Sequence, residues 1–167
     1  MQATGLPPEW LAAHYPTALE AFDIMVLHRE SLTQIDPQAS TVEAGLEALA
    51  AIARRSPVWP RLVVVTLGAE GAVAISGDGS VTHAAAPDVT VVDLTGAGDA
   101  FVGALLATVL NAAPTDTALR LACAAGSLQT TRYGAQEVLP DAAVLARLAG
   151  LPETALAAFQ SESGMHP

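Results

Sequence analysis

The sequence predicts an α/β protein with a mostly parallel sheet and one β-hairpin, and three stretches of the chain carry that prediction. Residues 61–67 (RLVVVTL) form a continuous apolar, β-branched run without polar alternation, typical of a parallel strand covered on both faces. Residues 22–27 (FDIMVL) form a second apolar run of strand length. Short apolar segments on either side of Gly77-Asp78-Gly79 predict a hairpin, with strands over 72–76 and 80–83.

The helices between and after these strands are predicted from caps and periodicity. Ser40-Thr41-Val42-Glu43 has the spacing of a capping box, with Ser40 as the cap, and the apolar face that follows ends at Ser56-Pro57. Residues 101–110 are apolar almost all round, which predicts a helix inside the core. Further helices are expected after a cap at Thr115 or Asp116, over 141–148 and 152–160, and as two short pieces within 1–22.

Composition and charge limit the kinds of protein this chain can be. With 167 residues and 51% hydrophobic content, we expect residues 1–167 to form a single domain, with a frayed tail at 162–167. The net charge is −10, with seven arginines and no lysine, which argues against nucleic acid or an anionic membrane as a partner. The lone Cys123 lies in an apolar helical run and suggests a buried structural thiol. Without a leader or a membrane span in the sequence, we expect a cytoplasmic protein.

A glycine-rich stretch, residues 93–101 (DLTGAGDAF), stands between a β-branched run at 89–92 and the apolar helix, so we expect strand, turn and helix in that order. Two glycines around an alanine let successive N–H groups converge at the start of the helix, where the helix dipole also attracts anions. Asp99 would lie beside that point, where it could take a proton from a hydroxyl that attacks a phosphoryl group.

Other interpretations of this stretch exist. Glycine turns before helices are common, and Asp is an ordinary residue in a first helical turn. A dinucleotide-binding G-x-G-x-x-G would need glycine where Phe101 stands, and a Walker A loop needs a lysine, which this chain lacks.

The segment DLTGAGDAFVGALLA resembles the C-terminal signature D-T-x-G-A-G-D-x-F of the ribokinase-like (PfkB-type) carbohydrate kinases, with Leu94 in place of the usual threonine. The resemblance implies a three-layer ribokinase-like fold, truncated at its N-terminal side. It also implies that Gly96, Ala97 and Gly98 form an anion hole for the transferred phosphate, and that Asp99 is the base that activates the acceptor hydroxyl.

The same resemblance suggests where a nucleotide would bind. The segment VTLGAEGA is similar to the family's segment near the nucleotide phosphates, which implies ATP-site roles for Thr66, Gly68 and Gly71. The family places adenine near the helix that contains Ala124 and Ser127. Two simpler explanations stand beside these: a turn alone calls for such glycines, and close packing alone accounts for an alanine-rich helix.

The cofactors follow from the resemblance as well. They are ATP with Mg²⁺ carried by the nucleotide and, in some members, K⁺. Residues 132–135 (RYGA) resemble the family's R-x-G-A loop, which with the backbone around Asp93 and Thr95 can hold a monovalent cation; here that implies Asp93, Thr95 and Gly134.

One family motif is missing. Where the family usually carries N-x-x-E, which helps to organise Mg²⁺ and phosphate, this chain has His28 and Ser31. Glu30 could substitute after a shift of one residue, or the segment could be a solvated polar turn. His28 alone is more typical of a hydrogen-bonded surface residue than of a metal ligand.

The resemblance covers about residues 22–148 and corresponds to the C-terminal, nucleotide-binding half of a family member. We therefore expect ATP-dependent phosphoryl transfer to a sugar-like acceptor, with a catalytically incomplete nucleotide-binding or scaffold remnant as the alternative. Because a truncated sheet exposes an apolar edge, we expect a homo-oligomer or a partner that supplies the missing half.

Overall fold

The computed structural model describes residues 21–36, 38–56, 58–135, 141–152 and 155. The chain divides into two compact units, one built from Met1–Leu67 with Val73–Thr82 and the other from Gly68–Ala72 with His83–Pro167. The elements in chain order are β1 (Ile24–His28), a 3₁₀ turn η1 (Arg29–Ser31), α2 (Leu32–Ile35), α3 (Val42–Arg55), β2 (Leu62–Thr66), a 3₁₀ turn η2 (Gly68–Glu70), β3 (Ala72–Ser76), β4 (Val81–Ala84), α4 (Ala97–Leu110), α5 (Thr115–Gln129) and α6 (Ala142–Leu148).

The strands form one mixed sheet in the order β1-β2-β3-β4. β1 and β2 are parallel, in a register that runs from Ile24 opposite Leu62 to His28 opposite Thr66. β3 and β4 form the predicted hairpin, where the Ser76 N–H donates to the Ser80 carbonyl at 3.0 Å. The three stretches that predicted strands therefore all form strands, within one or two residues of the expected bounds.

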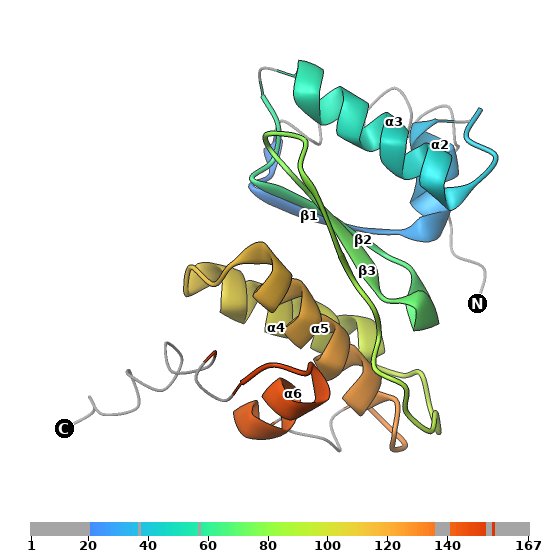
Figure 1. The fold of residues 1–167 in the computed structure, drawn as a ribbon. Helices are drawn as coiled ribbons and strands as arrows, with labels where there is room; N and C mark the ends of the chain where they lie inside the picture. The colour runs from blue at the N-terminus through green and yellow to red at the C-terminus, as the bar shows by residue number, and fades with distance from the viewer. Residues whose placement is uncertain (1–20, 37, 57, 136–140, 153–154, 156–167) are drawn as a thin grey trace. The chain divides into compact units, whose positions relative to one another are not determined.

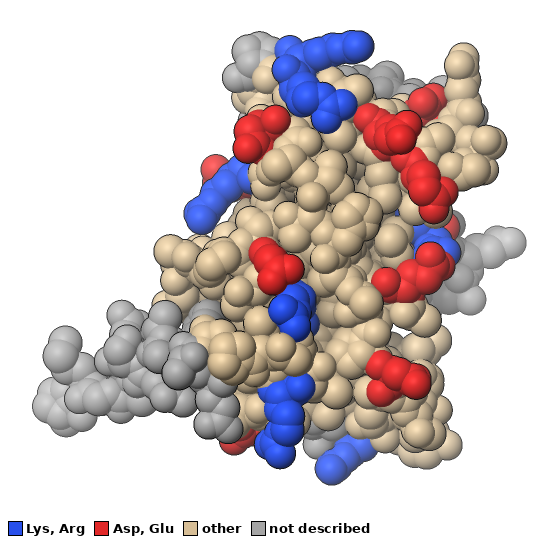
Figure 2. Space-filling view, in the orientation of Figure 1, with Lys and Arg blue, Asp and Glu red and all other residues tan. Residues whose placement is uncertain are grey.

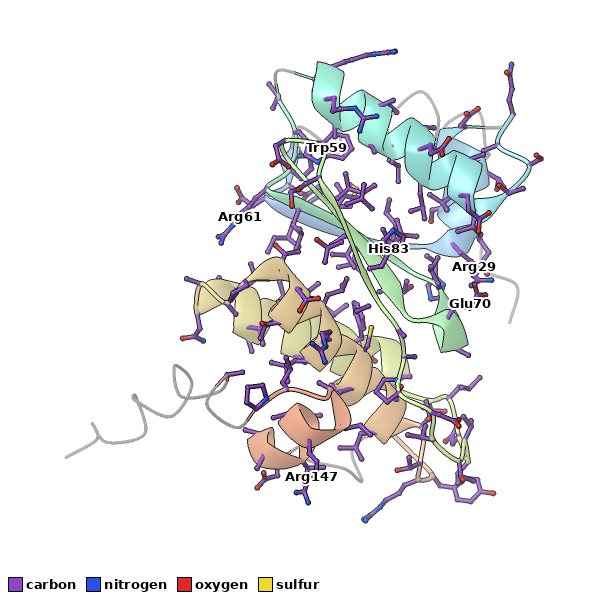
Figure 3. The ribbon with its side chains drawn as sticks, in the orientation of Figure 1. Arg29, Trp59, Arg61, Glu70, His83 and Arg147 are labelled. Carbon is purple, nitrogen blue, oxygen red and sulfur yellow. The ribbon has the colours of Figure 1, made fainter. Side chains whose placement is uncertain are left out.

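The first unit has its own apolar core beneath α3 (Figure 1). The buried face of α3 packs on alternate residues of the strands, including Val63 and Val65 of β2, as the covered-strand pattern predicted. Trp59 lies beneath α3 at the edge of this core (Figure 3). The N-cap of α3 is one residue later than expected, at Thr41 and not at Ser40. The Thr41 Oγ1 accepts the Ala44 N–H at 3.2 Å.

The second unit contains α4, α5 and α6, which Figure 1 draws side by side. Among these three helices α5 has the most buried side chains, and α6 packs on it through Leu145, Ala146 and its C-cap residue Ala149. Small residues allow α4 and α5 to approach closely, since a Cβ added to Gly126 would lie 3.2 Å from the Ala97 carbonyl oxygen. Cys123 is buried within α5, and desolvation raises the pKa of its thiol to about 11, which agrees with a structural role.

Three local predictions were wrong. Residues 89–92 form no strand, because β-branched residues favour extended backbone but a strand also needs a paired neighbour, and Val91 and Val92 are exposed. α5 begins at Thr115 with Pro114 as its N-cap, and neither Thr115 nor Asp116 caps it. α4 is not wholly inside the core, since Leu110 is 78% exposed and Leu106 is 36% exposed.

Other predictions fall outside or at the margin of the described part of the chain. The two helical pieces expected within residues 1–22 lie outside it except for residues 21–22, as do the tail at 162–167 and most of 152–160. No helix among the described residues combines the length and the apolar character needed to cross a bilayer. The face in Figure 2 has basic side chains distributed among acidic ones, with no continuous basic surface.

Candidate functional site

The glycine stretch forms the start of α4, as predicted. Gly96 is the N-cap and has φ +80°, a left-handed backbone that favours glycine. The Ala97 N–H donates to the Leu94 carbonyl at 3.2 Å, and the Ala100 N–H donates to the Gly96 carbonyl at 2.9 Å. Between them, the N–H groups of Gly98 and Asp99 have no hydrogen-bond partner among the described residues. The Gly96 N–H likewise has no partner among the described residues, whereas the Ala97 N–H, which the resemblance also placed in the anion hole, donates to the Leu94 carbonyl.

Gly98 has no steric reason within the described structure to be glycine. A Cβ added there would meet nothing within 4 Å, and its φ is not positive. Glycine inside a helix is less favourable than alanine by up to about 1 kcal/mol. The place that a Gly98 side chain would occupy is thus open space, in the first turn of the helix, where the dipole attracts anions.

Asp99 is in the first turn of the same helix and its side chain is exposed. Among the described residues, none forms a hydrogen bond or ion pair with its carboxylate. The turn therefore offers two N–H donors and one free carboxylate next to each other, which is the combination needed to hold an anion and accept a proton beside it.

The segment just before this turn is held by hydrogen bonds to the Asp93 carboxylate. Asp93 Oδ1 accepts both the Thr95 N–H at 3.0 Å and the Thr95 hydroxyl at 2.8 Å, while Oδ2 accepts the Gly134 N–H at 3.0 Å. The Gly134 N–H bond, followed by those from Thr95, holds the pKa of Asp93 below its ordinary value. The structure thus brings Asp93, Thr95 and Gly134 together, as the resemblance implied.

Two residues at the end of α5 also hold this segment, and the sequence interpretation did not find them. The Thr130 carbonyl accepts the N–H groups of Val92 at 2.8 Å and Asp93 at 3.1 Å. The Gln129 side-chain amide donates to the Gly134 carbonyl at 2.6 Å and to the Thr95 carbonyl at 3.3 Å. One signal was available: Gln129 is an amide at the end of a helix whose preceding residues, 121–128, are small or apolar.

The residues predicted near the nucleotide phosphates lie in or around η2. Gly71 has φ +102°, and a Cβ there would be 2.0 Å from the Ala84 carbonyl oxygen, so close backbone approach by itself requires glycine. Gly68 has φ +66° but open space around it. Thr66, at the end of β2, donates its hydroxyl to the Leu27 carbonyl at 3.3 Å.

The two residues expected beside adenine have different surroundings. Ala124 is fully buried in the cluster formed by α5 and α6, so helix packing accounts for its small size. Ser127 is half-buried, and its carbonyl accepts the Thr130 N–H at 3.1 Å and the Thr130 hydroxyl at 2.8 Å.

The position of the missing N-x-x-E motif is a polar turn after β1. His28 Nδ1 lies 3.2 Å from Glu30 Oε2, and both side chains are more than 70% exposed. Arg29 donates from its Nη2 to the Leu67 carbonyl. No three metal-binding side chains (His, Cys, Asp or Glu) cluster anywhere in the described ranges.

A separate hollow of about 420 Å³ lies at the N-terminal end of α5. Its polar lining includes Asp116 and Arg120, but the guanidinium of Arg120 donates to the Ala149 carbonyl at 2.6 and 3.0 Å and to the Gly150 carbonyl at 2.9 Å. Arg120 thereby satisfies carbonyls at the end of α6, which is a structural role.

The pattern around α4 has counterparts in known proteins. The family model described as "pfkB family carbohydrate kinase" matches residues 4–142. The chain belongs to the pfkB carbohydrate kinase family. Within this family, the chain is 46% identical over 82 residues to the aminoimidazole riboside kinase of Salmonella typhimurium, covering 46% of this chain and 25% of that protein. It is 38% identical over 131 residues to a fructokinase of Klebsiella pneumoniae, covering 74% of this chain and 40% of that protein.

Solved structures of pfkB relatives confirm the α/β ribokinase-like fold. The fructokinase of Vibrio cholerae O395, bound to fructose, ADP and a calcium ion, matches with a TM-score of 0.66 at 34% identity, over 85% of this chain and 46% of that one. The ribokinase of Arabidopsis thaliana, in complex with ribose and ATP, matches with a TM-score of 0.68 at 25% identity, over 90% of this chain and 46% of that one. The chain thus spans between a quarter and a half of the length of these pfkB relatives.

Proposed function

We propose that this chain is the nucleotide-binding half of an ATP-dependent kinase that phosphorylates a hydroxyl of a sugar or related acceptor. The observation that carries the proposal is the first turn of α4. There, the unpaired N–H groups of Gly98 and Asp99 lie under open space beside a free carboxylate. Relatives named as fructokinases and ribokinases support the same class of reaction.

In this mechanism, the two amides donate hydrogen bonds to oxygens of the phosphoryl group and stabilise the negative charge that it carries during transfer. The Asp99 carboxylate accepts the proton of the acceptor hydroxyl as that oxygen attacks the γ-phosphorus. The bond from phosphorus to the bridging oxygen breaks, and ADP leaves with the electron pair. Asp99 then releases its proton to solvent.

Magnesium would enter this site bound to the phosphates of the nucleotide. Since the described residues contain no cluster of three metal-binding side chains, the phosphates themselves would hold Mg²⁺, which supplies charge neutralisation for the transfer. Gly68, Gly71 and Ser127, all in the second unit, are proposed to line the remainder of the nucleotide site.

A specific observation favours a second candidate, a nucleotide-binding remnant without turnover. The positions of the missing N-x-x-E motif carry His28 and Ser31, and the Glu30 carboxylate that could substitute is paired with His28. Such a protein would bind nucleotide and phosphorylate nothing.

The Asp99→Asn variant separates the two candidates. If Asp99 is the base, a coupled assay over a panel of sugars should show turnover that falls by roughly 10²–10⁴-fold, whereas calorimetry should show that Mg·ATP still binds. Asp116→Asn is the control, because Asp116 is also an exposed aspartate in a first helical turn, where it lies 3.7 Å from Arg120 Nη1. Nucleotide binding without turnover in the wild type would favour the remnant, and absence of binding would refute both.

A further inference from the structure

The side-chain amide of Gln129 lies between two loops that the cation interpretation would join through an ion. Gln129 is 3% exposed, and its Nε2 reaches the Gly134 carbonyl at 2.6 Å and the Thr95 carbonyl at 3.3 Å. Thr95 and Gly134, together with Asp93, are the set that the family resemblance assigns to a monovalent cation.

Four oxygens of that set already accept hydrogen bonds: the Thr95 and Gly134 carbonyls and both carboxylate oxygens of Asp93. A monovalent cation is held when carbonyl and carboxylate oxygens converge and replace its water shell. Here both carbonyls accept from the Gln129 amide, Asp93 Oδ1 accepts two donors from Thr95, and Asp93 Oδ2 accepts the Gly134 N–H. The residues present therefore do not fit a cation while Gln129 occupies this place.

We infer that the Gln129 amide takes the place of the cation, so that this chain holds the loops before α4 without K⁺. An amide NH₂ group has two N–H donors, which is enough to bridge two carbonyls. Its burial removes competition from water, so the bridge is stronger than the same contacts on the surface.

This bridge positions the anion-binding turn. Thr95 directly precedes Gly96, and Gly134 directly precedes Ala135, whose Cα lies 3.0 Å from the position of a Cβ built on Gly96. Gln129 thus joins the two chain segments that enclose the N-cap of α4. It is a positioning residue, and only its effect on nucleotide affinity rests on the proposed function.

Two variants distinguish a cation substitute from ordinary packing. Gln129→Ala removes the donors and opens space between the carbonyls, whereas Gln129→Met removes the donors but fills the space. Thermal unfolding of the chain without nucleotide is measured in KCl and in N-methyl-D-glucamine chloride at equal ionic strength. This readout does not require the chain to bind ATP.

The expected results differ for each protein. The wild-type midpoint should be the same in the two salts. In N-methyl-D-glucamine chloride, both variants should have a lower unfolding midpoint than the wild type. Added K⁺ should raise the midpoint of Gln129→Ala in a saturable manner and should not change the midpoint of Gln129→Met. If K⁺ changes the unfolding midpoints of Gln129→Ala and Gln129→Met by the same amount, or changes neither, the inference is overturned.

The wild type alone also decides the question if a variant does not fold. A saturable rise of the wild-type midpoint with K⁺, relative to N-methyl-D-glucamine, would overturn the inference. Calorimetry with Mg·ADP in the two salts gives a second readout, in which the wild-type dissociation constant should be unchanged by K⁺. Failure of Mg·ADP to bind in either salt would count against the proposed function and leave the unfolding result to stand.

Discussion

Two neighbouring segments in the second unit differ in how their polar groups are used. In the segment from Val92 to Thr95, the Asp93 carboxylate accepts three hydrogen bonds, and residues at the end of α5 hold the backbone on the other side. A few residues later, the Gly98 and Asp99 amides and the Asp99 carboxylate have no partner among the described residues.

This difference shows how a rigid frame can present reactive groups. Unpaired amides at a helix start are tolerated where water or a ligand can reach them, and they bind an anion best when they do not have to move. The hydrogen-bonded segment from Val92 to Thr95 fixes the N-cap of α4. The first turn of α4 remains open to an anion. The following changes test each side of this comparison, beginning with the largest expected effect.

Asp93→Asn should cause the largest loss of stability, because an Asn side chain cannot accept on both of its terminal atoms, and its NH₂ group would oppose either the Gly134 or the Thr95 donors. The expected result is a lower urea midpoint with an unchanged m-value at neutral pH. An unchanged midpoint would show that the hydrogen bonds to the Asp93 carboxylate do not stabilise the fold.

The same variant should also change the pH dependence of stability. Because the folded-state pKa of Asp93 is lowered, its contribution is complete above the unfolded-state pKa of about 3.9 and is lost as pH falls through the lower folded-state pKa. The wild type should lose more stability than Asp93→Asn below about pH 4. Glu43 and Asp78 also have lowered pKa values, so only the difference between the two proteins reports on Asp93.

Gly96→Ala should have the next largest effect. A left-handed backbone costs a residue with a Cβ about 1–2 kcal/mol, and the new Cβ would be 3.0 Å from the Cα and Cβ of Ala135. Urea unfolding should show this loss, and Mg·ATP affinity should fall because the turn must shift. A variant with wild-type stability and affinity would contradict the role of Gly96 in fixing the N-cap.

The sequence predicted the elements whose signals are local. β2, the hairpin and α4 follow from residue pattern and turn residues alone, and the β-branched run at 89–92 misled because a strand also requires a partner strand. The same holds for the site. The signature segment predicted Gly96, Ala97, Gly98 and Asp99 as site residues, and these roles stay predictions. The bond from the Ala97 N–H to the Leu94 carbonyl could not be foreseen from sequence, because it depends on how the turn closes.

Long-range contacts explain what the sequence could not provide. Gln129 is 34 residues from Thr95, and nothing in its immediate neighbours indicates that its amide would join two loops. Likewise, the apolar residues of α4 suggested a core helix, although Leu110 is largely exposed. Periodicity identifies an apolar surface but does not identify what covers it.

The smallest expected effect is a gain in stability from Gly98→Ala and Gly103→Ala. Both glycines lie in α4, and an added Cβ would meet nothing within 4 Å at either position. Each change should raise the free energy of unfolding by up to about 1 kcal/mol, since alanine favours helix. A loss of stability at Gly98 would mean that its glycine is needed by the fold itself.

Calorimetric titration of Mg·ATP into these same two variants tests the central claim most directly. If the open surface over Gly98 receives the phosphates, Gly98→Ala should bind Mg·ATP at least tenfold more weakly than the wild type, although it is no less stable. Gly103→Ala, which adds the same methyl group farther along α4, should bind as the wild type does. Equal, measurable affinity of all three proteins would contradict phosphate binding at this turn.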